Sequence, residues 1–130
     1  MVGDPVGDFI VQIMNAGAVR KESISVPYSK MKASVADTLV RLGYVKSAAK
    51  RGKKVKKTLD VELVYKDNVH HIRGVKRVSK PGRRVYAGVG EIHPVKFGKG
   101  TLVLSTPEGI ITGDEARAKH IGGEQLFIIW

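Results

Sequence analysis

The chain has 130 residues, with 23 Lys and Arg against 12 Asp and Glu, no Cys, and a formal net charge of +11. This length suits one domain or two very small ones, and the 42% of hydrophobic residues can bury a core. The lack of Cys excludes disulfides and thiolate metal sites and fits a reducing cytosol. We expect no membrane span and no secretory signal, because long apolar runs and a basic first segment are absent. Nucleic acid is the expected partner of such a basic globular protein.

The positive charge is concentrated in the middle of the chain. Residues 46–84 carry 14 Lys and Arg against three acids, whereas the rest of the chain carries nine of each. The densest part is residues 50–57, with six cations in eight positions. We expect this stretch to neutralise phosphates, with an affinity that falls steeply as salt rises. A solvated loop that only aids solubility is the alternative, and the absence of interleaved large apolar residues disfavours membrane binding.

Apolar spacing in the first half of the chain predicts an α/β layer of two helices on three strands. The first helix is expected to start at a cap on Asp4 and to end at Gly17, and Ser29 is a suitable N-cap for the second. Residues 70–75 are expected to be the third strand of the sheet whose other strands flank the basic loop. The predicted elements are a helix over 4–16, a strand over 23–27, a helix over 30–42, and strands over 44–48, 58–65 and 70–75.

The second half of the chain predicts a mainly β domain with one short helix. An apolar run closes on Trp130, which predicts that the final strand is buried in the core. The predicted elements are strands over 83–89, 101–104 and 110–112, a helix over 113–120, and a strand over 124–130. We therefore predict an α/β (α+β) protein of two small domains, an N-terminal domain over residues 1–76 and a C-terminal domain over 77–130.

Two short segments of the second half have side chains suited to nucleic acid. Ser105 and Thr106 present small hydroxyls in a turn, where they can bond phosphate, ribose or base edges without filling the space of a nucleotide. An ordinary capped turn explains the same residues, and the local sequence alone favours it. Glu124 follows Gly122 and Gly123, which allow another backbone to approach closely, and its carboxylate can accept from a base amino group.

Few residues suit catalysis or metal binding. His70 and His71 are adjacent in a predicted strand, so their side chains face opposite sides and cannot easily hold one metal. His93 and His120 have no carboxylate or Cys partner at ligand spacing. Neither a Gly-x-Ser-x-Gly elbow nor a phosphate-binding Gly-x-x-x-x-Gly-Lys-Ser/Thr loop occurs. We expect no enzyme activity, no cofactor and no metal.

Several motifs follow one another in a characteristic order and spacing. They are DPVGD at Asp4–Asp8 with Asn15-Ala16, VPYSKMK at Val26–Lys32, RVSKPGRRVY at Arg77–Tyr86, LSTPEGIIT at Leu104–Thr112, EAR at Glu115–Arg117, GGE at Gly122–Glu124, and the terminal Trp130. In these motifs the chain resembles the small-subunit ribosomal protein S8 family of bacterial type, over nearly its full length.

This resemblance implies a structural constituent of the small ribosomal subunit, a cytoplasmic protein of two α/β domains. It implies direct binding to a helical region of the central domain of the rRNA and help in nucleating assembly there. The implied partners are this rRNA, neighbouring small-subunit proteins and, in many bacteria, the mRNA of the protein's own operon, whose translation it represses. The free protein is expected to be a monomer that does not contact a membrane.

The resemblance also implies which residues contact RNA. In the second domain they are Ser105, Thr106, Glu108, Gly109, Gly122, Gly123 and Glu124, with Tyr86 close by. In the first domain they are Tyr28, Ser29 and Lys30, together with Lys53, Lys54, Lys56 and Lys57 of the basic segment. The turn at Ser105 and Thr106 thereby becomes a recognition element, because small hydroxyls suit the shallow minor groove, the 2′-hydroxyls and the unstacked bases of a distorted RNA helix.

We therefore expect the basic stretch to supply attraction and the hydroxyl turn to supply recognition. Glu124 is expected to orient the site or to accept from an amino group, because phosphate would repel its carboxylate. The chain departs from the family pattern at Glu108, where family members commonly carry Lys. An mRNA- or DNA-binding regulator with the same fold is the alternative function, and an enzyme acting on RNA lacks a suitable acid, base or metal group.

Overall fold

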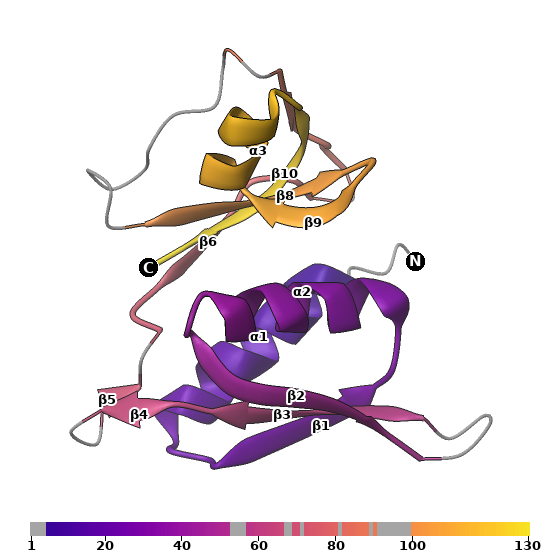
Figure 1. Cartoon of the computed structure of the whole chain (residues 1–130). Helices are drawn as coiled ribbons and strands as arrows, with labels where there is room; N and C mark the ends of the chain where they lie inside the picture. Colours follow the sequence, from indigo (N-terminus) through magenta and orange to yellow (C-terminus); the bar gives the residue numbers. More distant parts are fainter. Residues whose placement is uncertain are drawn as a thin grey trace. The chain divides into compact units, whose positions relative to one another are not determined.

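The computed structural model contains two compact units, Pro5–Ile72 and Arg73–Trp130, and each is described by itself (Figure 1). Helices and antiparallel sheets are both present, and the C-terminal unit is mainly β with one short helix, which confirms the predicted fold class. The domain boundary between residues 76 and 77 stays a prediction. None of the helices in the described parts of the chain is long and apolar enough to cross a bilayer. The structure describes residues 5–52, 57–66, 69–70, 72–80, 82–88, 90 and 100–130.

The N-terminal unit has two helices on one face of a three-stranded antiparallel sheet (Figure 1). The strand order is β1-β3-β2, and β4 and β5 form a separate two-stranded ribbon. The elements are α1 (Pro5–Ala18), β1 (Ser23–Pro27), α2 (Lys30–Arg41), β2 (Val45–Arg51), β3 (Thr58–Leu63), β4 (Tyr65–Lys66) and β5 (Val69–His70).

The alternating sequence of β3 explains why this sheet has one apolar and one polar face. Leu59, Val61 and Leu63 are buried, while Asp60 and Glu62 lie between them. Successive side chains of a strand point to opposite faces, so the three apolar residues face the helices and the two acids face away. Burying each large apolar side chain contributes roughly 1.5–3 kcal/mol, which fixes the register of the strand.

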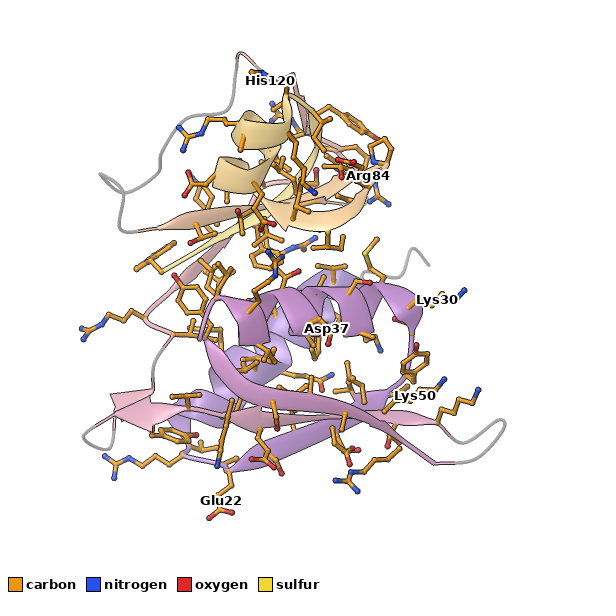
Figure 2. The ribbon with its side chains drawn as sticks, viewed as in Figure 1. Glu22, Lys30, Asp37, Lys50, Arg84 and His120 are labelled. Atoms are coloured by element: carbon orange, nitrogen blue, oxygen red, sulfur yellow. The ribbon has the colours of Figure 1, made fainter. Side chains whose placement is uncertain are left out.

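The second helix follows its sequence signals closely. The Ser29 hydroxyl caps α2 by accepting from the Lys32 N–H at 3.1 Å, and Gly43 adopts a left-handed φ of 83° just beyond the helix. Asp37 lies on the exposed side of this helix (Figure 2). The apolar side chains of Val35 and Leu39 are fully buried, but Met31 at the start of the helix is exposed.

The first helix continues past the residue at which it was expected to end. Gly17 lies inside α1, and Arg20 adopts the left-handed conformation, with φ of 59°. The Lys21 N–H donates to the Ala16 carbonyl and closes the last turn. The Tyr65 hydroxyl donates to the Lys21 carbonyl at 2.6 Å. Burial raises the pKa of Tyr65, and the positive charge of Arg20 offsets part of that rise. The predicted cap at Asp4 lies outside the described residues.

The prediction that residues 70–75 complete this sheet is wrong. β3 has β1 on one edge and β2 on the other, so neither edge of β3 is left for another strand. His70 pairs with Tyr65 in the β4–β5 ribbon instead. Val75 begins β6 (Val75–Arg77), which belongs to the sheet of the C-terminal unit. The third strand of the N-terminal sheet is β1.

The C-terminal unit is a five-stranded antiparallel sheet with β10 at its centre. β10 pairs with β6 and β7 along one edge and with β8 along the other, and β8 also pairs with β9. The strand predicted over 83–89 is formed only at β7, and Val89 lies outside the described residues. Besides β6, the elements are β7 (Tyr86–Ala87), β8 (Thr101–Thr106), β9 (Gly109–Thr112), α3 (Gly113–Lys119) and β10 (Gly123–Ile129).

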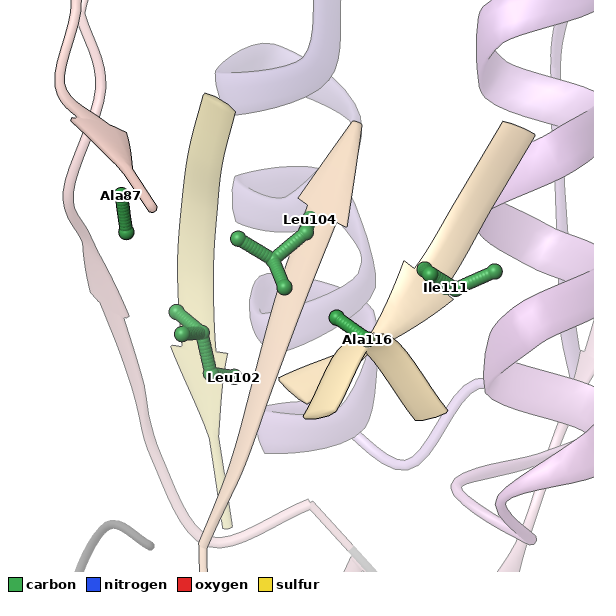
Figure 3. Close-up of a cluster of buried hydrophobic side chains, with 5 residues drawn as sticks. All are labelled: Ala87, Leu102, Leu104, Ile111 and Ala116. Carbon is green, nitrogen blue, oxygen red and sulfur yellow. The ribbon is translucent and has the colours of Figure 1, made fainter. Parts of the chain in front are cut away.

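A cluster of buried side chains joins α3 to this sheet (Figure 3). Its members are Ala87, Leu102, Leu104, Ile111 and Ala116, with Ile121 and Ile128 packed against them. The helix begins with a capping box, in which the Thr112 hydroxyl accepts from the Glu115 N–H and the Glu115 carboxylate accepts from the Thr112 N–H. Capping and burial together hold this short helix on the sheet.

The final strand is buried, as predicted. Phe127 is 1% exposed and Ile129 is fully buried, whereas Trp130, just beyond the strand, is half-buried. The Trp130 N–H donates to the Gly74 carbonyl at 3.0 Å, and the Gly74 N–H donates back to the Trp130 carbonyl at 3.1 Å. The Trp130 ring lies so close to Gly74 that it would have to move to make room for a Cβ at residue 74.

Phe127→Ala is expected to lower the free energy of unfolding of the C-terminal unit by about 3–5 kcal/mol, because it leaves a cavity in the core. The matched control is Tyr86→Ala, an aromatic truncation in the same sheet at a side chain that is 67% exposed. That change should cost less than about 1 kcal/mol. Denaturant unfolding measures both, and equal losses would contradict the core assignment.

Candidate nucleic-acid interface

Three neighbouring strands of the C-terminal sheet place an aromatic ring, a carboxylate and a hydroxyl in one row. Glu124 of β10 pairs with Tyr86 of β7 on one side and with Ser105 of β8 on the other. Directly paired residues of antiparallel strands project their side chains from the same face, with Cβ atoms about 4.5–5.5 Å apart. We call Tyr86, Glu124 and Ser105 the recognition row.

The centre of the recognition row carries an ion pair. Nη1 of Arg84 lies 3.2 Å from Oε2 of Glu124. The Glu124 side chain is only 16% exposed, whereas that of Arg84 is 56% exposed. Sequence reasoning missed Arg84 as a site residue. Its position two residues before Tyr86 could have indicated this role, because alternate residues of an extended segment share a face.

The segment that bears Arg84 and Tyr86 is tied to β10. The buried Ser79 hydroxyl accepts from the Val85 N–H at 2.8 Å, and the Ser79 N–H donates to the Gln125 carbonyl at 3.0 Å. The Gln125 N–H in turn donates to the Val85 carbonyl at 2.8 Å. These bonds place Arg84 and Tyr86 beside Glu124.

The two hydroxyls predicted to act as a pair have different surroundings. The Thr106 hydroxyl donates to the Gly109 carbonyl at 2.9 Å and accepts from the Glu108 N–H at 3.1 Å, so it holds the β8–β9 turn. Gly109 has φ of 112°, a conformation that favours glycine. The Ser105 hydroxyl has no hydrogen-bond partner among the described residues. Ser105 can therefore bond a ligand without disturbing the turn, and Glu108 of the turn is exposed.

Gly122 and Gly123 allow a close backbone approach, and the approaching backbone is that of this chain. A Cβ on Gly122 would lie 2.3 Å from the Ala87 carbonyl oxygen of β7. A Cβ on Gly123 would lie 2.3 Å from the Ser105 carbonyl oxygen of β8. Both glycines therefore let β7 and β8 come near β10, which brings the recognition row together.

In the N-terminal unit, the start of α2 lies beside the β2–β3 hairpin. The Tyr28 N–H donates to the Lys57 carbonyl at 3.1 Å, and the Lys50 ammonium lies 4.6 Å from the centre of the Tyr28 ring. Ser29 and Lys30 follow at the positive end of the helix dipole (Figure 2). We call Tyr28, Ser29, Lys30, Lys50 and Lys57 the cationic cluster.

The cationic cluster joins two segments that were predicted separately to contact RNA. Lys50 was counted in the basic run but was not named as a site residue. Its place over an aromatic ring depends on strand pairing, so the local sequence could not show it. The positions of Lys53, Lys54 and Lys56 lie outside the described residues.

Some cations of the central stretch are engaged by acids on the open face of the N-terminal sheet. Lys46 lies 3.8 Å from Glu62, and Arg51 lies 3.1 Å from Asp60. The Ser25 hydroxyl also donates to Asp60, at 2.7 Å. The count of 14 Lys and Arg in the central stretch therefore overstates the number of cations available to a ligand. No group of three His, Asp or Glu side chains suited to a metal is found among the described residues.

Gly123→Ala is expected to destabilise the C-terminal unit by about 1–3 kcal/mol, because the new methyl group meets a rigid carbonyl of β8. Gly82→Ala is the matched control, since a Cβ there would have no atom within 4 Å. The control should change stability by no more than about 0.5 kcal/mol. Thermal unfolding of both variants decides the point, and a stable Gly123→Ala variant would contradict the close approach.

Comparison with known proteins gives a consistent result over the whole chain. Residues 4–130 match the family model described as ribosomal protein S8. The small ribosomal subunit protein uS8 of Mycoplasmopsis agalactiae is 41% identical over 129 residues, which are 99% of this chain and 98% of that protein. The protein of the same name from Dictyoglomus turgidum is 44% identical over 99% of this chain and 98% of that protein. The one from Mesoplasma florum is 41% identical over the full length of both chains.

Proposed function

The chain belongs to the ribosomal protein S8 family, and on this premise we propose that it is a structural protein of the small ribosomal subunit. In this proposal it binds the central domain of the small-subunit rRNA directly and helps to nucleate assembly there. The observation that supports the proposal is the pairing of Glu124 with both Tyr86 and Ser105, which sets a carboxylate, an aromatic ring and a hydroxyl in one row.

The recognition row suits an irregular RNA helix. The wide, shallow minor groove of A-form RNA presents 2′-hydroxyls and base edges, which the Ser105 hydroxyl can reach as donor or acceptor. The exposed ring of Tyr86 offers a surface on which an unstacked base can lie. The Glu124 carboxylate can accept from a base amino group. Glu108, Gly109, Gly122 and Gly123 act in this proposal as the frame around the row.

The cationic cluster supplies attraction that depends little on sequence. Lys30, Lys50 and Lys57 are exposed, and the α2 N-terminus adds the positive end of a helix dipole. Lys53, Lys54 and Lys56 add three further charges between β2 and β3. Contacts of this kind go to phosphates, so they position the protein while base contacts give specificity.

The partners in this proposal are the rRNA, neighbouring small-subunit proteins and the mRNA of the protein's own operon, and the free chain is a monomer. A regulator that binds mRNA or DNA with the same fold is the second candidate. Filter binding of a central-domain rRNA fragment against duplex DNA separates the two. A clear preference for the rRNA fragment supports the ribosomal function, and equal affinities would contradict it.

Ser105→Ala is expected to weaken binding to the rRNA fragment by about 1–3 kcal/mol, because it removes a directed hydrogen bond to the RNA. The salt dependence should stay unchanged, since no charge is removed. Thr106→Ser is the control, because it keeps the hydroxyl that holds the turn and should keep most of the affinity. Filter binding at several salt concentrations measures both, and a changed salt slope for Ser105→Ala would contradict the assigned role.

Replacing Lys53, Lys54, Lys56 and Lys57 by Gln should have the opposite signature. The plot of log affinity against log salt should flatten by about 0.7–0.9 for each phosphate that the variant no longer neutralises. The preference for rRNA over DNA should remain. Lys46→Gln is the control. Because Lys46 lies against Glu62, its replacement should change the slope less, per charge removed, than the four-lysine variant does. Loss of selectivity in the four-lysine variant would assign recognition, rather than attraction, to this segment.

A further inference from the structure

We propose that Arg84 is a positioning residue of the RNA site, whose guanidinium holds the Glu124 carboxylate so that the carboxylate can accept from a base close to phosphates. This inference rests on the proposed function. It follows from the 3.2 Å contact between Nη1 of Arg84 and Oε2 of Glu124, and from the place of Glu124 between Tyr86 and Ser105.

A carboxylate at the centre of a site for a polyanion needs a compensating charge. The Glu124 side chain is largely buried, so water screens its charge poorly. Without a cation nearby, this charge would repel each phosphate that approaches the recognition row. Arg84 supplies the compensation from the exposed side, where the RNA would arrive.

The geometry of the pair leaves an acceptor on Glu124 available. The contact with Arg84 uses Oε2, and Oε1 has no hydrogen-bond partner among the described residues. An ionised carboxylate can accept several hydrogen bonds through its two oxygens. Arg84 therefore fixes the direction of the carboxylate and leaves Oε1 to accept from a base amino group.

Arg83 provides a matched comparison in the same segment. Both arginines are exposed, but among the described residues Arg83 has only backbone bonds with Lys80, with no carboxylate partner. Arg83→Ala and Arg84→Ala thus remove the same charge one residue apart. Only the second should release Glu124.

The test is a double-mutant cycle by filter binding on the central-domain rRNA fragment, with duplex DNA in parallel. Arg84→Ala should weaken binding to the rRNA fragment about tenfold or more, the lower part of the range for a base-directed contact. Arg83→Ala should weaken binding less and should change mainly the salt slope. Arg84→Lys should recover part of the affinity, since it keeps the charge but not the planar fork.

The decisive result is the sign of the effect of Glu124→Gln. In the wild-type background this change should weaken binding to the rRNA fragment, because it replaces the carboxylate that Arg84 holds by a neutral amide. In the Arg84→Ala background it should strengthen binding, because it removes an uncompensated negative charge. Additive losses in the two backgrounds would overturn the inference and make Arg84 an independent phosphate contact.

Two controls separate this inference from other failures. Thermal unfolding of each variant shows how much of the protein is folded in the binding assay. If loss of folded protein accounts for the whole loss of affinity, the positioning role is overturned. Repulsion of phosphate acts on any polyanion, so the strengthening in the Arg84→Ala background should also appear on duplex DNA. A wild-type chain with no preference for rRNA would contradict the proposed function, while the DNA arm of the cycle would still decide the role of Arg84.

Discussion

The pairing of β10 with strands on both of its edges is the interaction on which the C-terminal unit depends. One end of this strand buries Phe127 and Ile129, and the other end carries Glu124. A slip of one residue in the register would move each side chain to the opposite face of the sheet. The β10–β8 register shifts between Gln125 and Phe127, and Glu124 pairs with Ser105 on the near side of that shift. The stability of the sheet and the geometry of the recognition row therefore both depend on the pairing of β10.

In the proposed function, the two units divide the work of binding between long-range and short-range forces. Charges in the cationic cluster act over roughly a Debye length, about 8–10 Å at physiological salt, and bring a polyanion to the protein. The recognition row acts only on contact, through a hydroxyl, a held carboxylate and an aromatic ring. The short Ser105 side chain would let the RNA backbone come close, which a long cationic side chain at the same position would prevent.

Local signals in the sequence predicted most of the elements but not all of the pairings. Ser29, Gly43 and the alternation in β3 act through neighbouring residues, so the second helix and its sheet could be predicted. Residues 70–75 were misassigned because both edges of β3 are occupied, a fact that depends on the position of β1. Gly17 was misread as a helix end because burial inside α1 outweighs its low helix propensity.

The candidate site shows the same limit. Tyr86, Glu124 and Ser105 could be named from the sequence motifs, but their shared row depends on strands that are far apart along the chain. The ion pair of Arg84 with Glu124 and the stacking of Lys50 on Tyr28 are contacts of this kind. The separate roles of Ser105 and Thr106 depend on the turn geometry at Gly109, which the sequence motif alone does not determine.

The order of the strands along the chain has a consequence for synthesis. All three strands of the N-terminal sheet precede residue 64, so this unit can fold while translation continues. The central strand of the C-terminal sheet, β10, instead follows the other four strands in the sequence, so β6 and β7 cannot pair until it has been made and β8 can pair only with β9. In the proposed function, a nascent chain would thus carry its attractive surface before its selective one, and discrimination between RNAs would begin only after β10 has been made.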